Sequence, residues 1–165
     1  MSVEKFDISV TYKGLKTFDC GNKMINRFVQ KSLKKRVKKH FSQAYVLLEN
    51  DTFVGFYTLD TFSIARDTFE KDERPSSLPP MVSVVKLAML GVDKKRQGQG
   101  IGKRLLRDAM LKVVDISEVA GCTGLFLLAE EEAIAFYKGL GFKPLKEDSP
   151  LPMFLHIETI LQALK

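Results

Sequence analysis

Glycines at every second position, directly after a long apolar run, constrain the fold of this chain more than any other feature. Residues 82–92 are rich in Val, Leu and Met and predict a buried strand. The charged segment 93–102 follows and carries Gly98, Gly100 and Gly102. Apolar residues then recur at helical spacing, which predicts an amphipathic helix over residues 103–116. A buried strand, a glycine turn and a helix in this order indicate an α/β domain.

The rest of the chain alternates between strand and helix patterns. Apolar alternation or short apolar runs predict strands at residues 6–10, 44–48, 53–59, 125–129 and 153–157. The second and third of these form a predicted hairpin over 44–60, with Asn50-Asp51 as its turn. Helices are expected from the 19–22 turn to Phe41, over 130–140 and over 158–165. In the first of these, an apolar stripe at spacings of three to four residues is predicted to be buried: Ile25, Phe28, Val29, Leu33, Val37 and Phe41. Residues 63–80 hold three prolines and are expected to be a loop, with a short helix around 63–71. A length of 165 residues fits a single domain spanning 1–165.

The glycine turn has the composition of an anion site. Glycine lets the backbone approach a ligand closely, and the first N–H groups of a helix have no partner inside it. Lys103 and Arg104 add positive charge in the first helical turn, which fits an anion docked there. The phosphate loop of NTPases is excluded because Arg104 follows Gly102-Lys103 and Gln97 replaces the first glycine. The dinucleotide pattern is excluded because Lys103 stands where its third glycine belongs.

The spacing that does fit is Gln97-x-x-Gly100-x-Gly102 at the end of a strand. A second pattern, A-x-x-F-Y-x-x-x-G-F, lies at residues 133–142. Together the two patterns resemble the GNAT family of N-acetyltransferases. The resemblance implies a mixed, mostly antiparallel sheet of six to seven strands with helices on both faces. It also implies direct transfer of the acetyl group of acetyl-CoA to an amine.

The same resemblance implies roles for individual residues. The strand end would pair with the pantetheine arm, and the glycine turn would bind the pyrophosphate. The implied acetyl-CoA residues are Leu90, Gly91, Val92, Gln97, Gly98, Gln99, Gly100, Ile101, Gly102, Lys103 and Phe136. The coenzyme is expected between the strand ending at Val92 and the strand ending at Ala129. Tyr137 matches the tyrosine that protonates the departing thiolate, as a phenol can do; the other interpretation is a half-buried aromatic residue without a catalytic role.

The general base is not identifiable from the sequence. Many relatives carry Asn where this chain has Glu130, so the contact made there is lost or replaced. Glu130 could act as an acid or base, but Glu131 and Glu132 beside it favour a solvated acidic turn. The strand predicted over residues 82–92 contains no Glu that could serve as the general base. This favours an acceptor amine that is already largely neutral, such as the α-amine of an aminoacyl ester.

Three further segments narrow the resemblance within the family. They are F-D-C-G-N-x-x-x-N-x-F at 18–28, V-G-F-Y-T-L at 54–59 and P-M-F-L at 152–155. They resemble the acetyltransferase toxins of bacterial toxin–antitoxin pairs. The resemblance implies acetylation of the α-amine of aminoacyl-tRNA, which blocks translation. It also implies a homodimer and a small antitoxin protein as a partner.

One helix face carries the positive charge of the chain. The formal net charge is +6, and residues 31–39 contain six basic residues and no acidic one. At helical spacing, a basic face forms from Arg27, Lys31, Lys34, Lys35 and Lys38. Such a stripe can neutralise RNA phosphates. A solvated helix face and a docking site for an acidic antitoxin segment remain alternatives. A GNAT enzyme acting on a small-molecule or protein amine is an alternative function, and so is a non-catalytic module that binds RNA or CoA.

The cysteine and histidine content argues against a metal site. Cys20 and Cys122 are far apart, and His40 and His156 complete no ligand spacing, so no metal is expected. The first residues lack the apolar core of a secretory signal, and no run of about 18 apolar residues occurs. The chain is therefore expected to be cytoplasmic, with reduced cysteines and no membrane partner.

Overall fold

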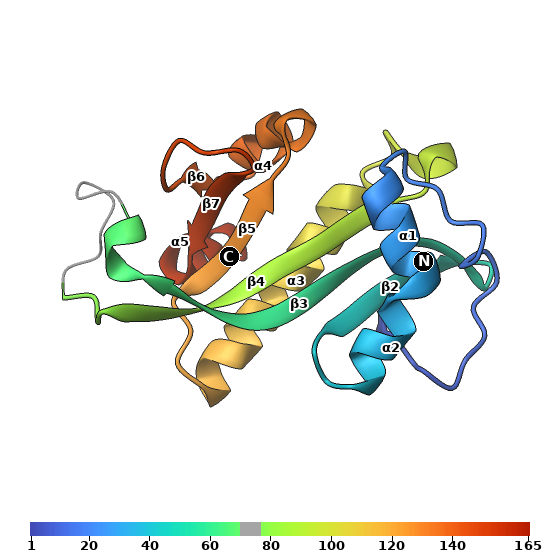
Figure 1. Ribbon diagram of the computed structural model, residues 1–165, viewed down its shortest axis with the longest axis horizontal. Coiled ribbons are helices and arrows are strands. Elements are labelled where there is room, and N and C mark those ends of the chain that lie inside the picture. Colours follow the sequence, from blue (N-terminus) through green and yellow to red (C-terminus); the bar gives the residue numbers. More distant parts are fainter. Residues whose placement is uncertain (70–76) are drawn as a thin grey trace. The chain divides into compact units, whose positions relative to one another are not determined.

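The computed structural model describes residues 1–69 and 77–165, which form a seven-stranded mixed sheet with helices. The strand order is β1-β2-β3-β4-β5-β7-β6 (Figure 1). The strands are β1 (Ser2–Lys5), β2 (Gln43–Glu49), β3 (Thr52–Ala65), β4 (Met81–Val92), β5 (Gly124–Ala129), β6 (Lys143–Pro144) and β7 (Leu151–His156). The helices are α1 (Lys23–Lys31), α2 (Leu33–Lys38), α3 (Ile101–Val119), α4 (Ile134–Gly139) and α5 (Ile157–Ala163). This is the mixed α/β class expected from the sequence.

The chain forms two compact units, and each is described by itself. The first comprises residues 1–60 and 87–109, and the second comprises residues 61–86 and 110–165. The long elements β3, β4 and α3 contribute residues to both.

The first unit is built on the predicted hairpin. β2 and β3 pair antiparallel from Gln43–Leu59 to Glu49–Thr52. Asn50 (φ 49°) and Asp51 (φ 63°) both adopt left-handed conformations, as a two-residue hairpin turn requires. β1 pairs with the outer side of β2. The hairpin prediction is therefore confirmed, including its turn.

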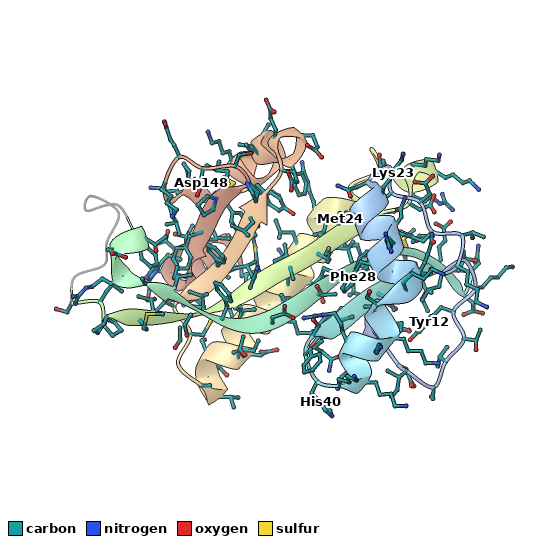
Figure 2. All side chains as sticks on the ribbon, viewed as in Figure 1. Tyr12, Lys23, Met24, Phe28, His40 and Asp148 are labelled. Carbon is teal, nitrogen blue, oxygen red and sulfur yellow. The ribbon has the colours of Figure 1, made fainter. Side chains whose placement is uncertain are left out.

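Helices α1 and α2 cover the hairpin of this unit (Figure 1). Val29, Leu33 and Val37 are buried in one cluster with residues of β2 and β3. Phe28, labelled in Figure 2, lies on α1, and its ring stacks on that of Phe56 with the centroids 6.3 Å apart. The apolar stripe predicted from the sequence is thus the face that packs on the sheet, because its spacing places these side chains on one side of the helix.

The helix predicted from the 19–22 turn to Phe41 buries the expected face, but its limits differ from the prediction. The helix is interrupted at Ser32, which separates α1 from α2. The helical hydrogen bonds nevertheless continue there, because Ser32 N–H donates to the Phe28 carbonyl at 2.8 Å. The helix ends at Lys38 because His40, with a φ of 61°, turns the chain in a left-handed conformation, and Phe41 N–H bonds back to the Arg36 carbonyl. Phe41 is therefore 60% exposed, and its predicted burial is wrong.

The prediction of a first strand at residues 6–10 is also wrong. The strand ends at Lys5, and the following residues form a turn. The Asp7 carboxylate accepts hydrogen bonds from Ser9 N–H and Ser9 Oγ, and Tyr12 Oη accepts one from Asp7 N–H. These local bonds compete with strand pairing, as short polar side chains do in turns.

The second unit packs the parallel part of β4 against the C-terminal strands. Val85–Leu125 and Lys86–Phe126 pair in parallel, while β5 and β7 pair antiparallel from Gly124–His156 to Ala129–Leu151. Its core contains Ile64, Phe69, Val82, Val84, Phe126, Leu145 and Phe154. The strand at 125–129, the strand at 153–157 and the C-terminal helix are confirmed to within two residues.

The expected loop over 63–80 is partly wrong. β3 continues through Ala65, and a 3₁₀ turn follows at Arg66–Thr68. Strand extension is favoured here because Phe62 stacks on Phe126 and Ile64 is buried in the core of the unit. The rest of the expected short helix falls partly on residues 70–76, which lie outside the described residues.

Candidate active site

The glycine turn predicted as an anion site follows β4 and is anchored on β3. Asp93 N–H donates to the Val54 carbonyl at 2.8 Å. The Asp93 side chain then caps a 3₁₀ turn at Lys94–Arg96 by accepting from Lys95 N–H at 3.0 Å. Arg96 forms an ion pair with Glu49 at the end of β2. These contacts fix the entry of the turn, which runs from residue 93 to the start of α3.

The backbone of the turn is open at its two middle glycines. Gly98 and Gly100 both have φ of 79°, a conformation that side-chain-bearing residues rarely adopt. A Cβ atom built on either residue would meet no protein atom within 4 Å. The neighbouring space is therefore free for a ligand, and the glycines are required by conformation rather than by packing.

The first turn of α3 adds hydrogen-bond donors. Arg104 N–H bonds to the Gly100 carbonyl at 3.1 Å, so the helix ladder begins there. The N–H groups of Ile101, Gly102 and Lys103 precede that bond and have no partner within the helix. Helix α3 is 19 residues long, and its N-terminus carries the positive end of a macrodipole. The turn and the helix start can together bind a phosphate group.

The Gln97 side chain has a structural role in the turn. Its amide donates to the carbonyls of Cys20 and Val92, both at 2.9 Å. Both amide hydrogens of Gln97 are thereby used within the protein. Its contribution to an anion site is therefore restricted to its backbone N–H group.

The end of β4 is mostly buried. A Cβ on Gly91 would lie 3.1 Å from Ile25 Cγ2 and from Phe56 Cε1, so this glycine allows close packing of the core. Val92 is 9% exposed, and Leu90 is half-buried. Leu90, Gly91 and Val92 can therefore serve a ligand mainly through their backbone groups.

Tyr137 lies on the short helix α4 in the second unit. Its side chain is 9% exposed and packs edge-on against Phe136 and Phe142, with centroids 5.2 and 5.4 Å away. Burial raises the pKa of Tyr137 to about 12, because the charged phenolate is disfavoured away from water. The phenol is therefore neutral at physiological pH and can donate a proton. The helix ends after Gly139, and Gly141 (φ 99°) turns the chain into the next strand.

The chain matches a known family over most of these elements. Residues 40–144 match the model of the acetyltransferase (GNAT) domain. The chain belongs to the GNAT acetyltransferase family. The expectation drawn from the two sequence patterns is confirmed, and the chain is an acetyltransferase.

Two curated relatives of this acetyltransferase are toxins. It is 31% identical over 154 residues to a probable toxin TacT of Sinorhizobium fredii, covering 87% of this chain and 84% of the relative. It is 30% identical over 140 residues to a tRNA-acetylating toxin of Mycobacterium tuberculosis, covering 84% and 83%. The resemblance to acetyltransferase toxins is thereby confirmed.

Solved structures of toxins share the fold of the acetyltransferase. A bacterial toxin superposes with a TM-score of 0.95 at 35% identity, covering 99% of this chain and 94% of the other. The toxin AtaT complexed with acetyl-methionyl-tRNAfMet superposes at 0.89, with 29% identity and 99% coverage of both chains. A mutant of AtaT bound to acetyl-CoA and the C-terminus of the antitoxin AtaR superposes at 0.85, with 28% identity and coverages of 99% and 98%.

The acetyltransferase exposes the basic face predicted from its sequence. The five cations lie on α1 and α2 and are all exposed: Arg27, Lys31, Lys34, Lys35 and Lys38. Among the described residues, none of the five forms an ion pair. Arg36 differs, because its Nε donates to Ser42 Oγ and its guanidinium lies over the ring of Phe41. The basic face is therefore free to meet an anionic partner.

The acidic turn before α4 is solvated. Glu130, Glu131 and Glu132 are exposed, and the Glu130 side chain makes no cap hydrogen bond. This confirms the expectation of a solvated acidic turn.

Within residues 1–69 and 77–165, no group of three or more His, Cys, Asp or Glu side chains could hold a metal ion. In the same ranges, every helix is too short or too polar to cross a bilayer.

The sequence interpretation missed two residues beside the glycine turn. Asp19 and Asn26 stand in a pattern that was assigned only to the toxin resemblance. The structure places the 19–22 turn against the glycine turn, since Lys94 N–H donates to the Asp19 carbonyl at 2.8 Å. Asp19 precedes the N-cap residue Asn22, and Asn26 lies inside α1. Their positions indicate a helix start and do not reveal a distant partner.

Proposed function

We propose that this acetyltransferase moves the acetyl group of acetyl-CoA to the α-amine of an aminoacyl-tRNA and acts as a translation-blocking toxin. The observation that carries the proposal is the match over 99% of both chains to AtaT in complex with acetyl-methionyl-tRNAfMet. The tRNA-acetylating toxin of M. tuberculosis supports the same acceptor. The exposed basic face on α1 and α2 supports a polyanionic acceptor on physical grounds.

The glycine turn is proposed to hold acetyl-CoA. Backbone N–H groups of the turn and of the α3 start bind the pyrophosphate, and the space beside Gly98 and Gly100 accommodates it. Backbone groups at the end of β4 pair with the pantetheine arm. The proposed coenzyme residues are Leu90, Gly91, Val92, Gln97, Gly98, Gln99, Gly100, Ile101, Gly102, Lys103 and Phe136. AtaT bound to acetyl-CoA supports this co-substrate.

Tyr137 is proposed as the general acid. The acceptor nitrogen attacks the thioester carbonyl, the C–N bond forms and the C–S bond breaks. Tyr137 donates its proton to the departing sulfur, and the proton lost by the amine restores the phenol. The high pKa of Tyr137 keeps this proton in place before the reaction. The amine of an aminoacyl ester is a weaker base than a lysine amine, so a larger fraction is neutral without a dedicated base.

Partners and organisation follow from the same proposal. A single acetyltransferase domain over residues 1–165 is proposed, and it is supported by β3, β4 and α3, which contribute residues to both compact units. A small antitoxin is the proposed protein partner, supported by AtaT bound to the C-terminus of AtaR. A cytoplasmic location is part of the proposal, because charged tRNA is cytoplasmic. A homodimer is proposed from the resemblance to the toxins.

The test uses purified protein, radiolabelled acetyl-CoA and three kinds of acceptor. These are bulk aminoacylated tRNA, the same tRNA after deacylation, and a panel of polyamines, aminoglycosides and peptides. Label should enter charged tRNA and be released with the amino acid when the ester is hydrolysed. Label on a small amine or peptide, with none on charged tRNA, would overturn the proposed acceptor. Salt-dependent RNA binding without acetyl transfer to any acceptor would indicate a binding module.

A further inference from the structure

We propose that Asp19 and Asn26 are positioning residues that hold the acetyl-CoA turn in its binding conformation. The inference rests on the proposed role of the glycine turn, and it concerns residues that lie outside that turn in the sequence. Together with Cys20, they form a group here termed the clamp.

The clamp is closed by reciprocal hydrogen bonds. Asp19 Oδ1 accepts from Gly21 N–H and from Asn26 Nδ2, both at 2.9 Å. Asn26 Oδ1 accepts from Cys20 N–H at 2.8 Å. Asn26 therefore uses its oxygen and its nitrogen toward the same turn, and a residue of similar shape but different polarity cannot do both.

The clamp contacts three residues of the glycine turn. Asp19 N–H donates to Asp93 Oδ2 at 3.5 Å. Lys94 N–H donates to the Asp19 carbonyl at 2.8 Å, and Lys94 Nζ lies 2.9 Å from Asp19 Oδ2. Gln97 Nε2 donates to the Cys20 carbonyl at 2.9 Å. The Lys94 ammonium, with hydrogen bonds from Gly21 and Asn26, lowers the pKa of Asp19 to about 2, so the carboxylate is charged at any assay pH.

The position of these contacts explains how they would favour ligand binding. They hold residues 94–97, directly before Gly98 and Gly100, which adopt positive φ angles that glycine reaches without steric cost. A turn with two such glycines loses much conformational entropy when it closes on a ligand. Fixing its entry beforehand reduces that loss and raises affinity.

The main variant is Asn26→Asp, which removes the donor and places a second carboxylate 2.9 Å from Asp19. Calorimetric titration with CoA and with acetyl-CoA should show an affinity about 10- to 100-fold lower, the value of one or two hydrogen bonds to a charged group. The KM for acetyl-CoA should rise in parallel, while kcat at saturating acetyl-CoA stays within about twofold. Asn50→Asp, in the β2–β3 turn, is the control with the same change of charge.

A compensating pair separates positioning from general stability. Asp19→Asn alone should lower affinity about threefold or less, because its ion pair with Lys94 is exposed. The double variant Asp19→Asn/Asn26→Asp restores one donor and one acceptor between the two side chains. It should bind acetyl-CoA more tightly than Asn26→Asp. A double variant no better than Asn26→Asp would overturn the proposed geometry.

A second pair of variants keeps the test valid if Asn26→Asp does not fold. Gln97→Met removes both donors, to Cys20 of the clamp and to Val92, without adding charge, whereas Gln97→Arg retains donors. The first should lose acetyl-CoA affinity and the second should keep most of it. Equal affinity of the two variants would refute the clamp. Wild-type protein that binds neither CoA nor acetyl-CoA would refute the proposed function itself, which is a different outcome.

Discussion

Replacing Tyr137 by Phe removes one hydroxyl group from a buried ring. The ring contacts with Phe136 and Phe142, at 5.2 and 5.4 Å, do not involve that oxygen and remain. The free energy of unfolding should therefore change by less than about 1 kcal/mol. In a chain of this size that corresponds to a shift in Tm of less than about 4 °C.

The effect on catalysis should be far larger. A positioned general acid contributes about 10²- to 10⁴-fold, or roughly 3 to 5 kcal/mol of activation free energy. With a pKa of about 12, the phenol is protonated throughout pH 7 to 10, so the full contribution is available in this range. Tyr137→Phe should lower kcat by about 10² to 10⁴ with acetyl-CoA affinity nearly unchanged.

The assay measures transfer of labelled acetyl to charged tRNA, with acetyl-CoA affinity and Tm measured on the same samples. Tyr57→Phe is the matched control in another buried tyrosine. Tyr57 Oη donates to Asp108 Oδ2 at 2.5 Å, and losing such a bond costs about 1.5 to 3 kcal/mol of stability. Tyr57→Phe should therefore lower Tm and leave kcat unchanged. Full turnover by Tyr137→Phe, or an equal loss of kcat in both variants, would refute the role given to Tyr137.

Three further predictions concern the coenzyme turn, the basic face and alkaline stability. Gly100→Ala should fold, because a Cβ there meets nothing within 4 Å, but the strained φ and the blocked ligand side should weaken acetyl-CoA binding more than about tenfold by calorimetry. Gly121→Ala, at another open glycine, is its control and should bind normally. Lys34→Gln/Lys35→Gln should reduce the slope of log affinity for tRNA against log salt concentration by about 1.4 to 1.8. The control Lys146→Gln/Lys165→Gln should leave this slope unchanged. Equal slopes for the wild type and Lys34→Gln/Lys35→Gln would refute RNA contact at the basic face. Burial, with the Asp108 hydrogen bond, raises the pKa of Tyr57 above its ordinary 10.0, so its stabilising contribution is complete below pH 10 and is lost as pH rises further. Urea denaturation from pH 8 to 11 should show that the free energy of unfolding falls less with pH in Tyr57→Phe than in the wild type. The same fall with pH in both proteins would contradict this.

The local patterns of the sequence were sufficient for most elements. The apolar run at 82–92, the turn at Asn50-Asp51 and the apolar stripe from Ile25 to Val37 each produce their structure through nearby residues. Their periods of two and 3.6 residues determine which side chains face the core. The two family patterns identified the acetyltransferase for the same reason, since each of them consists of residues within one short segment.

Errors occurred where local signals competed. Phe6 and Ile8 alternate with polar residues like a strand, yet the hydrogen bonds of Asp7 to Ser9 close a turn. Phe41 continues the spacing of the helix, yet His40 ends it without a glycine to mark the end. In the 63–65 segment, stacking of Phe62 on Phe126 extends β3 into a stretch whose polar composition indicates a loop.

The sequence by itself determined the family, the position of the glycine turn and the charge on α1 and α2, because these depend on residue type and short spacing. Only the tertiary structure could show that Gln97 bonds to Cys20, 77 residues away, and that Asp19, itself bonded to Asn26, accepts a hydrogen bond from Lys94 at the entry of the glycine turn. It also decided that Gly91 serves core packing, whereas Gly98 and Gly100 border open space. Such distinctions depend on which distant segments meet, and spacing along the chain carries no record of that.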